Sequence, residues 1–381
     1  RYVTVVDADS RFARRILDAI DARNSAAVSP EPETAGAGAT STSLSADVGE
    51  LERAGEGSAF DHACWLRVLQ ALHLDELSRF WLHRFGHRLA GGPQTPGGAM
   101  LRAQLQPSGA EARAELDALW RRAGLAGVAD DADRAATHVW STMSFDPGPT
   151  VHGNDLVSLI VAADPTADDS ATLAAAVASA VTQRYAPLEV IVVRPAGTAA
   201  NDALTGGDGR VRVVEVAPGT GRAACRNAAL DAATGRYVAV HDVGTWAHPE
   251  RLAEQLRLLR TTTARAAVAP VFRVDDDGVP AADPESLPLA DVGGSLLVER
   301  ALIDELGPFD ASADAGDGAD AEMLARIERR AGHATVVRLQ VPLLIATVPD
   351  VDPAANHRAS GRARRDHYFG ARAVVPTAAT V

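Results

Sequence analysis

Acidic and imidazole side chains gather in one short stretch, HDVGTWAHPERL, at residues 241–252. The stretch follows an apolar run, Tyr-Val-Ala-Val, and continues into the predicted start of a helix at 249. In α/β enzymes, nucleotide and metal ligands commonly lie at such a strand-to-helix turn. The pattern therefore predicts that Asp242 is a nucleotide or metal ligand. Gly244 and Thr245 stand where a second and a third carboxylate would be expected.

The neighbouring histidines, aromatic residue and cysteines have simpler interpretations. His241 and His248 are predicted to be packing or capping groups rather than metal ligands, because each is isolated from other ligand-type residues. Trp246 is predicted to anchor the core, and Cys225 to be a small buried hydrophobe. The only other cysteine, Cys64, is far away in the sequence, so neither a disulfide framework nor a zinc site is indicated.

A glycine-rich turn before this stretch suggests a different ligand. Gly219, Gly221 and Ala224 give G-x-G-x-x-A between an apolar run at 211–216 and a helical segment, and Asp242 ends the next predicted strand. In dinucleotide sites such glycines admit the ligand, and the acid takes its ribose hydroxyls. The stretch resembles the first motif of class I methyltransferases. An S-adenosylmethionine-dependent methyltransferase is therefore one alternative.

Apolar runs and helical patterns alternate through the middle of the chain. Strands are predicted at 156–163, 188–193, 211–216 and 237–241, and helices at 169–184, at 221–233 and from 249. This alternation indicates an α/β fold, with a mostly parallel sheet covered by helices on both faces. In a methyltransferase the glycine-rich turn should follow the first strand of the sheet, whereas here two strands of the same domain precede it.

An ordered set of motifs resembles the family-2 glycosyltransferases, which have the nucleotide-sugar-binding GT-A fold. The matching segments are 158–161, 179–185, 188–193, 225–230 with 233–237, 242–251, 294–297, 306–310 and 318–322. The resemblance covers about 155–350 and keeps the family's order throughout. It is therefore favoured over the methyltransferase interpretation, which depends on a single turn.

The resemblance implies inverting transfer of a sugar from a nucleotide-sugar donor to a glycan acceptor, as in cell-surface polysaccharide synthesis. It implies that Asp320 is the general base with Glu322 as its neighbour, and that Asp242 binds the nucleotide and a divalent metal, Mg²⁺ or Mn²⁺. The donor-binding residues would be Arg194, Arg222, Arg226, Asn227 and Asp242. The alternative role for Asp320 and Glu322 is an acidic pair at a helix N-terminus, stabilised by the helix dipole.

The donor side departs from the family at two places. Arg194 and Pro195 stand where the family usually has two aspartates, and an arginine can only donate hydrogen bonds. Gly244 and Thr245 replace carboxylates, although Mg²⁺ often needs only one or two protein carboxylates when substrate phosphates complete its shell. A catalytically inactive GT-A domain that binds a glycan or a partner enzyme is therefore a further alternative.

Composition excludes several other functions. The formal net charge of −13 argues against binding to nucleic acid or to an anionic membrane surface. All 37 basic residues are arginines, which excludes lysine Schiff-base chemistry and a P-loop lysine. No apolar run approaches the roughly 18 residues of a membrane span. We expect a cytoplasmic chain that can act at the inner face of the membrane and, since it begins with Arg1, a fragment of a longer protein.

The sequence predicts five regions. They are a strand-helix remnant of a preceding domain at 1–23, a flexible linker at 24–58, a mainly helical region at 59–150, the glycosyltransferase-like domain at 155–350 and a basic C-terminal tail at 351–381.

Overall fold

The structure is a computed structural model, and it describes only part of the chain. The described residues are 96–104, 106, 108–129, 140, 143–162, 170–197, 207–275, 278–280, 294–311 and 319–347. They all belong to the compact unit that begins at Pro96. The predicted regions 1–23, 24–58 and 351–381 lie outside the described residues, and so does the first part of the predicted helical region.

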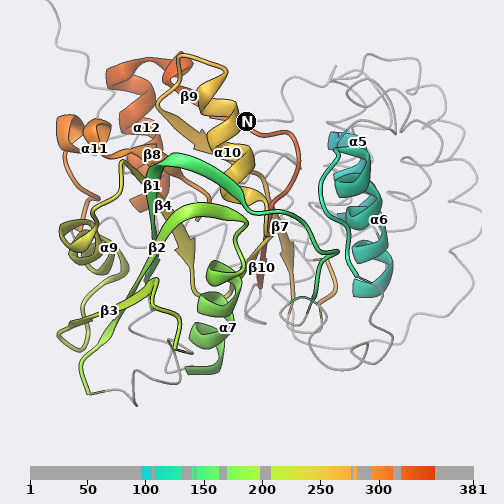
Figure 1. Cartoon of the computed structure of the whole chain (residues 1–381), viewed down its shortest axis with the longest axis horizontal. Coiled ribbons are helices and arrows are strands. Elements are labelled where there is room, and N and C mark those ends of the chain that lie inside the picture. The colour runs from blue at the N-terminus through green and yellow to red at the C-terminus, as the bar shows by residue number, and fades with distance from the viewer. Residues whose placement is uncertain are drawn as a thin grey trace, which may run out of the picture. The chain divides into compact units, whose positions relative to one another are not determined.

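A seven-stranded sheet forms the centre of this unit (Figure 1), in the order β3-β2-β1-β4-β8-β6-β9. Its strands are β1 (Val151–Ala162), β2 (Tyr185–Pro195), β3 (Val211–Val216), β4 (Tyr237–Asp242), β6 (Ala266–Val268), β8 (Leu297–Glu299) and β9 (Val336–Arg338). Only β8 pairs antiparallel with its neighbours, β4 and β6. The predicted mostly parallel α/β fold is confirmed.

Strand β1 is longer than the apolar pattern predicts. It starts at Val151, which pairs with Tyr185, and its register shifts between His152 and Val157. The residues before Val157 are mostly exposed or half-buried, whereas those from Val157 to Ala162 are buried. Hydrophobic periodicity therefore detects only the buried half of the strand.

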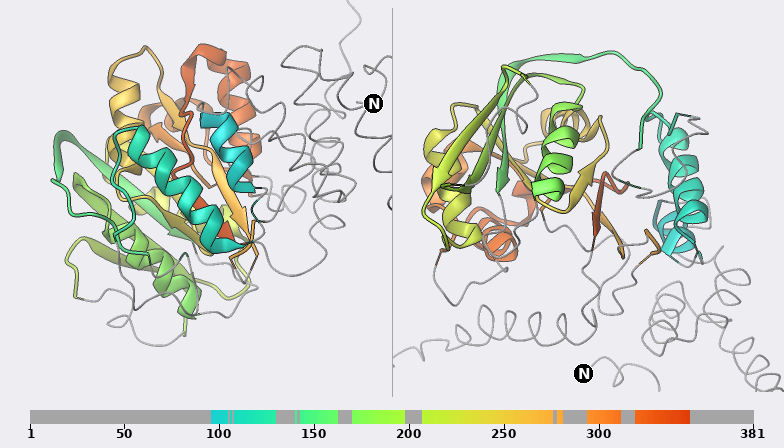
Figure 2. Two further views of the ribbon diagram at one scale, coloured as in Figure 1. Left: turned by 90° about the vertical axis from the view of Figure 1, so that its right-hand side faces the viewer. Right: turned by 90° about the horizontal axis from the view of Figure 1, so that it is seen from below.

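Helices cover both faces of the sheet (Figures 1 and 2). They are α7 (Ser170–Val181), α9 (Arg222–Ala232), α10 (Arg251–Arg260), α11 (Arg300–Leu306) and α12 (Ala319–Ala331), with a short 3-10 turn, η5 (His333–Thr335), after α12. Alternate residues of β1 enter opposite cores. Ile160 packs in the core of α9, α11 and α12, while Leu159 and Val161 pack in that of α7 and α10.

Within the same unit, a second sheet packs with two helices that precede it in sequence. Its order is β5-β10-β7, from β5 (Thr245–Ala247), β7 (Val271–Val274) and β10 (Leu344–Thr347). Helices α5 (Pro96–Gln104) and α6 (Gly109–Arg122) lie side by side (Figure 2) and share an apolar core with it. Trp120 donates its indole N–H to the Pro342 carbonyl at 2.8 Å. The described helices of the predicted 59–150 region thus pack on the predicted glycosyltransferase domain.

The strand order places a topological switch point between β1 and β4. From β1 the chain moves outward to β2 and β3, then returns to form β4 on the other side of β1. Open α/β sheets bind ligands at such a point, beyond the carboxyl ends of the strands. Asp242 ends β4 there, in register with Ala162 at the end of β1.

The same order disfavours the methyltransferase interpretation. The glycine-rich turn follows β3, whereas Asp242 ends β4, and β2 and β1 lie between these two strands. The dinucleotide arrangement needs the glycine-rich turn and the ribose-binding acid on adjacent strands.

None of the helices in the described part of the chain is long and apolar enough to span a bilayer.

Candidate active site

One buried arginine joins the two carboxylates that the sequence singles out. The Arg226 guanidinium lies on α9 and is 1% exposed. Its Nη2 donates to Asp242 Oδ1 at 2.5 Å and to Asp320 Oδ2 at 3.0 Å, and its Nη1 lies 2.8 Å from Asp320 Oδ1. The three predicted site residues therefore meet at the switch point, although Arg226 and Asp320 are 94 positions apart in sequence.

The two carboxylates respond differently to this shared cation. Burial acts to raise the pKa of Asp242, but the charges of Arg226 and Arg222 and the Arg226 hydrogen bond outweigh it and hold that pKa below its ordinary value. Burial raises the pKa of Asp320, and the neighbouring Asp242 charge adds to the increase while Arg226 opposes it. A carboxylate with a raised pKa is the better proton acceptor of the two.

One oxygen of Asp320 is buried and receives no aligned hydrogen bond from the described residues. Its Oδ2 accepts hydrogen bonds from the Gly294 backbone N–H and from Arg226, both at 3.0 Å. Its Oδ1 is close to Arg226 Nη1 but receives no aligned hydrogen bond within the described part of the chain. About 16% of the side chain is exposed.

Gly294 allows the two carboxylates to approach one backbone segment. Its φ is +70°, a conformation that side chains other than glycine rarely adopt. A Cβ atom there would lie 2.8 Å from Asp242 Oδ2. The sequence motif at 294–297 therefore has a steric cause, which is the close contact of this backbone with Asp242.

A polar network ties β1 to β2 and to the turn that precedes β4. The Ser158 hydroxyl donates to Glu189 Oε1 at 2.6 Å and accepts from the Gly235 N–H at 2.8 Å. Thr234 donates its N–H and its hydroxyl to the same Glu189 oxygen. A Cβ at Gly235 would lie 2.7 Å from the Ser158 nitrogen. These motif residues therefore hold the strands in place, and these hydrogen bonds join them to one another and not to Asp242 or Asp320.

Two polar side chains hold the turn that follows Asp242. The Ser179 hydroxyl accepts from the Ala247 N–H at 2.8 Å. Gln183 donates to the His248 carbonyl at 2.8 Å and accepts from the Leu252 N–H at 3.1 Å. Ser179 on α7 and Gln183 just after it therefore hold residues 247–252 in place. This segment follows the end of β4, so the position of Asp242 depends on it.

The residues around Asp242 do not fit a divalent metal. The Thr245 hydroxyl, which would be one ligand, donates to the Asp242 carbonyl at 2.5 Å instead. Gly244 has no side chain and a φ of +80°. No group of three or more His, Cys, Asp or Glu side chains that could hold an ion occurs in the part of the chain that the structure describes. The predicted Mg²⁺ or Mn²⁺ would have Asp242 as its one carboxylate ligand in this turn, and that carboxylate is already paired with Arg226.

Two other arginines that the sequence predicts to bind the donor, Arg222 and Arg194, differ in their relation to Asp242 and Asp320. Arg222 starts α9, and its charge acts on both Asp242 and Asp320. Arg194 is the penultimate residue of β2 with only 5% of its side chain exposed, and its Nη2 pairs with Glu215 on β3 at 2.9 Å. Arg222 therefore belongs to the charge cluster, whereas Arg194 pairs across the sheet edge.

Asn227 clamps a loop. Its Nδ2 donates to the Phe309 carbonyl at 2.9 Å, and its Oδ1 accepts from the Phe309 N–H at 3.0 Å. The Phe309 ring lies under the Arg226 guanidinium, 5.5 Å from Cζ to the ring centroid. The Asn227 amide thus helps to position Arg226 through the loop at 306–310.

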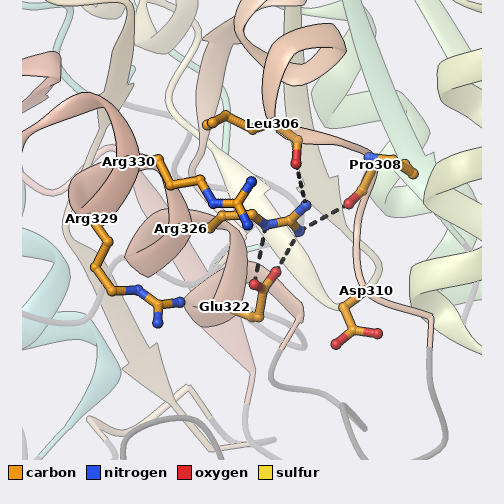
Figure 3. Close-up of a pocket in the computed structure, with 7 residues that line it drawn as sticks. All are labelled: Leu306, Pro308, Asp310, Glu322, Arg326, Arg329 and Arg330. Carbon is orange, nitrogen blue, oxygen red and sulfur yellow. Dashed lines mark hydrogen bonds and ion pairs between the residues drawn. The ribbon is translucent and has the colours of Figure 1, made fainter. Parts of the chain in front are cut away.

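Glu322 pairs with an arginine of its own helix. It forms a bidentate ion pair with Arg326, one turn further along α12, at 3.1 and 2.5 Å. Arg326 also donates to the carbonyls of Leu306, Gly307 and Pro308. Figure 3 shows this pair between α12 and the 306–310 loop, in a pocket that Arg329 and Arg330 also line. Glu322 therefore secures the loop that carries Phe309.

A further buried arginine was missed from sequence. Arg251 is 1% exposed, donates to Gln255 at 3.1 Å and to the Val240 carbonyl at 2.7 Å, and keeps Nη1 without a hydrogen bond among the described residues. Burial lowers its pKa, while Asp242 and Asp320 act to raise it. Arg251 and Gln255 are four residues apart on the apolar face of α10, which is a signal that the sequence contained.

The predictions for the other side chains near this turn are confirmed. His241 is fully buried, and burial lowers its pKa to about 3. His248 packs against aromatic rings and is fully buried as well. Trp246 stacks on Phe145 with ring centroids 4.9 Å apart, and Cys225 is 1% exposed in the core.

Comparison with known proteins identifies the family of the central segment. Residues 165–299 match the family described as Glycosyl transferase family 2. The succinoglycan biosynthesis protein ExoO of Rhizobium meliloti (strain 1021) is 34% identical over 124 residues, which cover 32% of this chain and 35% of ExoO. The segment at 165–299 belongs to the family-2 glycosyltransferases, and the chain spans about a third of the length of this curated relative.

Solved structures with a related arrangement are more distant. A crystal structure of S. aureus TarS residues 1–349 in complex with UDP-GlcNAc aligns with a TM-score of 0.41 and 17% identity, over 52% of this chain and 60% of that one. A mycobacterial protein aligns with a TM-score of 0.39 and 15% identity, over 58% of this chain and 79% of that one.

Proposed function

We propose that the chain is an inverting glycosyltransferase that transfers a sugar from a nucleotide-sugar donor to a hydroxyl group of a glycan acceptor. The family-2 segment supports the reaction class. The observation that carries the proposal for the site is the meeting of Asp242 and Asp320 on Arg226, at the switch point of a mostly parallel sheet. Both carboxylates keep part of their surface exposed, 17% and 16% respectively, so a ligand can reach them.

Asp320 is the general base in this proposal. The acceptor hydroxyl passes its proton to the Asp320 carboxylate while the acceptor oxygen forms a bond to the anomeric carbon. The bond between that carbon and the diphosphate oxygen breaks, and its electron pair leaves with the nucleoside diphosphate. Burial and the Asp242 charge raise the pKa of Asp320, which strengthens it as a base.

Asp242 and Arg222 hold the donor in this proposal. Asp242 can accept hydrogen bonds from donor hydroxyl groups, and Arg222, in the first turn of α9, can pair with the diphosphate. Asn227 and Glu322 contribute indirectly, because both fix the 306–310 loop against Arg226. Arg194 remains a predicted nucleotide contact at the end of β2.

The acceptor class follows from the relative. Because the relative is a succinoglycan biosynthesis protein, we propose a glycan of a cell-surface polysaccharide as acceptor. A cytoplasmic location with access to the inner face of the membrane is part of the same proposal.

Calorimetric titration of the full chain tests the proposal. UDP, GDP, dTDP, ADP and S-adenosylmethionine are titrated separately, and we expect one nucleoside diphosphate to bind. Asp242→Asn should weaken that binding, whereas the control Asp231→Asn, an exposed position on the same α9 helix, should leave it unchanged. Binding of S-adenosylmethionine alone would refute the proposal. If the folded chain binds none of these compounds, the inactive glycan-binding or partner-binding module is the better description.

A further inference from the structure

The cation of this site is already part of the chain. Arg226 contacts one oxygen of Asp242 and both oxygens of Asp320, with three nitrogen–oxygen distances between 2.5 and 3.0 Å. Its guanidinium is buried, and Phe309 lies against it. We propose that Arg226 takes the place of a divalent metal, and that the domain binds its nucleotide-sugar donor without a metal ion. This inference rests on the proposed function for the identity of the ligand.

The geometry leaves no place for a second cation between the two acids. Asp242 directs Oδ1 to Arg226, and the Gly294 backbone runs so near its Oδ2 that a Cβ atom at 294 would lie 2.8 Å from that oxygen. A metal ion bound here would lie against the Arg226 guanidinium, and two like charges repel strongly at such a distance. The planar guanidinium fork is suited to bridging two carboxylates, which a spherical ion would otherwise do.

The charges of the cluster already suit a diphosphate. Two carboxylates, Asp242 and Asp320, are accompanied by three guanidinium groups, those of Arg222, Arg226 and Arg251, each of which interacts electrostatically with both acids. The cluster thus has one more positive than negative charge. In a metal-dependent site, the ion supplies that excess. Here Arg222 lies at the start of α9, where it can approach the phosphates.

The residues at positions 244 and 245, which offer no carboxylate to a metal ion, are consistent with a site that uses Arg226 as its cation. The Thr245 hydroxyl closes the turn on the Asp242 carbonyl, and the Gly244 carbonyl accepts from the N–H and the hydroxyl of Thr347. Both residues are used to shape the turn. Residues 244 and 245 therefore shape the turn and carry no carboxylate, while Arg226 on α9 supplies the positive charge beside Asp242.

Two measurements on the full chain test the inference. In the first, Mn²⁺ is titrated into the protein alone and followed by electron paramagnetic resonance. We expect no bound Mn²⁺ below about 1 mM for the wild type. Arg226→Met should gain Mn²⁺ binding, because Asp242 and Asp320 lose their shared cation. The matched control Arg222→Met, one turn earlier on the same helix, should not gain it, because Arg226 still bridges the acids.

In the second measurement, calorimetry compares nucleoside diphosphate binding in EDTA and in Mn²⁺. We expect dissociation constants within about twofold of each other. Mn²⁺ binding to the wild-type protein, or an affinity at least about tenfold higher in Mn²⁺, would overturn the inference while the proposed function stands. If no nucleotide binds under either condition, the proposed function fails, and the Mn²⁺ titrations still decide whether Arg226 is the resident cation.

If Arg226→Met does not fold, Arg226→Lys replaces it. A lysine ammonium keeps the charge but cannot bridge both acids through a planar fork. We then expect weaker nucleotide binding in EDTA that Mn²⁺ partly restores. Nucleotide binding by Arg226→Lys that is equal to the wild type in EDTA would count against a bridging role for Arg226.

Discussion

His248 should make the folding stability strongly dependent on pH. Its Nδ1 accepts from the Glu250 N–H at 3.2 Å, and its Nε2 lies 3.0 Å from the Ala126 carbonyl, which only a donor can satisfy. The neutral ring with its proton on Nε2 makes both bonds, whereas the protonated ring loses the first. Trp120 and Phe145 pack on the ring, with centroids 5.1 and 4.7 Å away.

The magnitude follows from the pKa. Burial, with a smaller effect of the Arg184 charge, lowers the pKa of His248 from 6.5 to about 4, against the opposing effect of the Ala126 hydrogen bond. Between these values the unfolded chain binds a proton at this residue and the folded chain does not. The free energy of unfolding therefore falls as the pH falls through this window. At about 1.4 kcal/mol per pH unit, the loss reaches about 3 kcal/mol near pH 4.

Urea unfolding at several pH values between 7.5 and 4.5, followed by tryptophan fluorescence, measures this dependence. His248→Gln should be less stable at pH 7.5, because packing and one hydrogen bond are lost, but its stability should fall less steeply toward acid. His152→Gln, at an exposed position on β1, is the control and should keep the wild-type slope. If the slope of His248→Gln equals that of the wild type, the ring is not held neutral and the argument is wrong.

Three further changes test the site. Asp320→Asn should lower turnover by about 10²-fold or more with nucleoside diphosphate binding retained, because a carboxamide cannot take up a proton; full activity in a transfer assay would reject Asp320 as the base. Gly294→Ala should lower the free energy of unfolding by about 1–2 kcal/mol through its positive φ and should weaken nucleotide binding through contact with Asp242, as calorimetry and urea unfolding would show. Asn227→Ala should destabilise the fold by about 1–3 kcal/mol, because the N–H and carbonyl of Phe309 lose their partner; unchanged stability would mean that this clamp is dispensable.

The sequence by itself determined the local elements and the order of the motifs. The apolar runs that became β1, β2 and β4 are visible because buried parallel strands are hydrophobic on both faces, and the helices between the strands follow from their spacing. The edge strand β3 is half-buried and still stands out by its four valines. Asp242 and Asp320 could be selected because each lies in a recognisable motif at the end of a strand or at the start of a helix. The role of His241 and His248 as packing groups was also predicted from their isolation.

Only the tertiary structure decided which of these residues meet. Sequence periodicity describes neighbours two to four residues apart, whereas the contact of Arg226 with Asp320 spans 94 positions and depends on how α9 and α12 pack on the sheet. Asn227 and Glu322 have site-like positions in the motifs, but Asn227 bonds to Phe309 in the 306–310 loop. Glu322 pairs with Arg326, which in turn binds that loop. The identity of the cation between the two acids is likewise a property of this packing, because it depends on where the side chain of Arg226 ends.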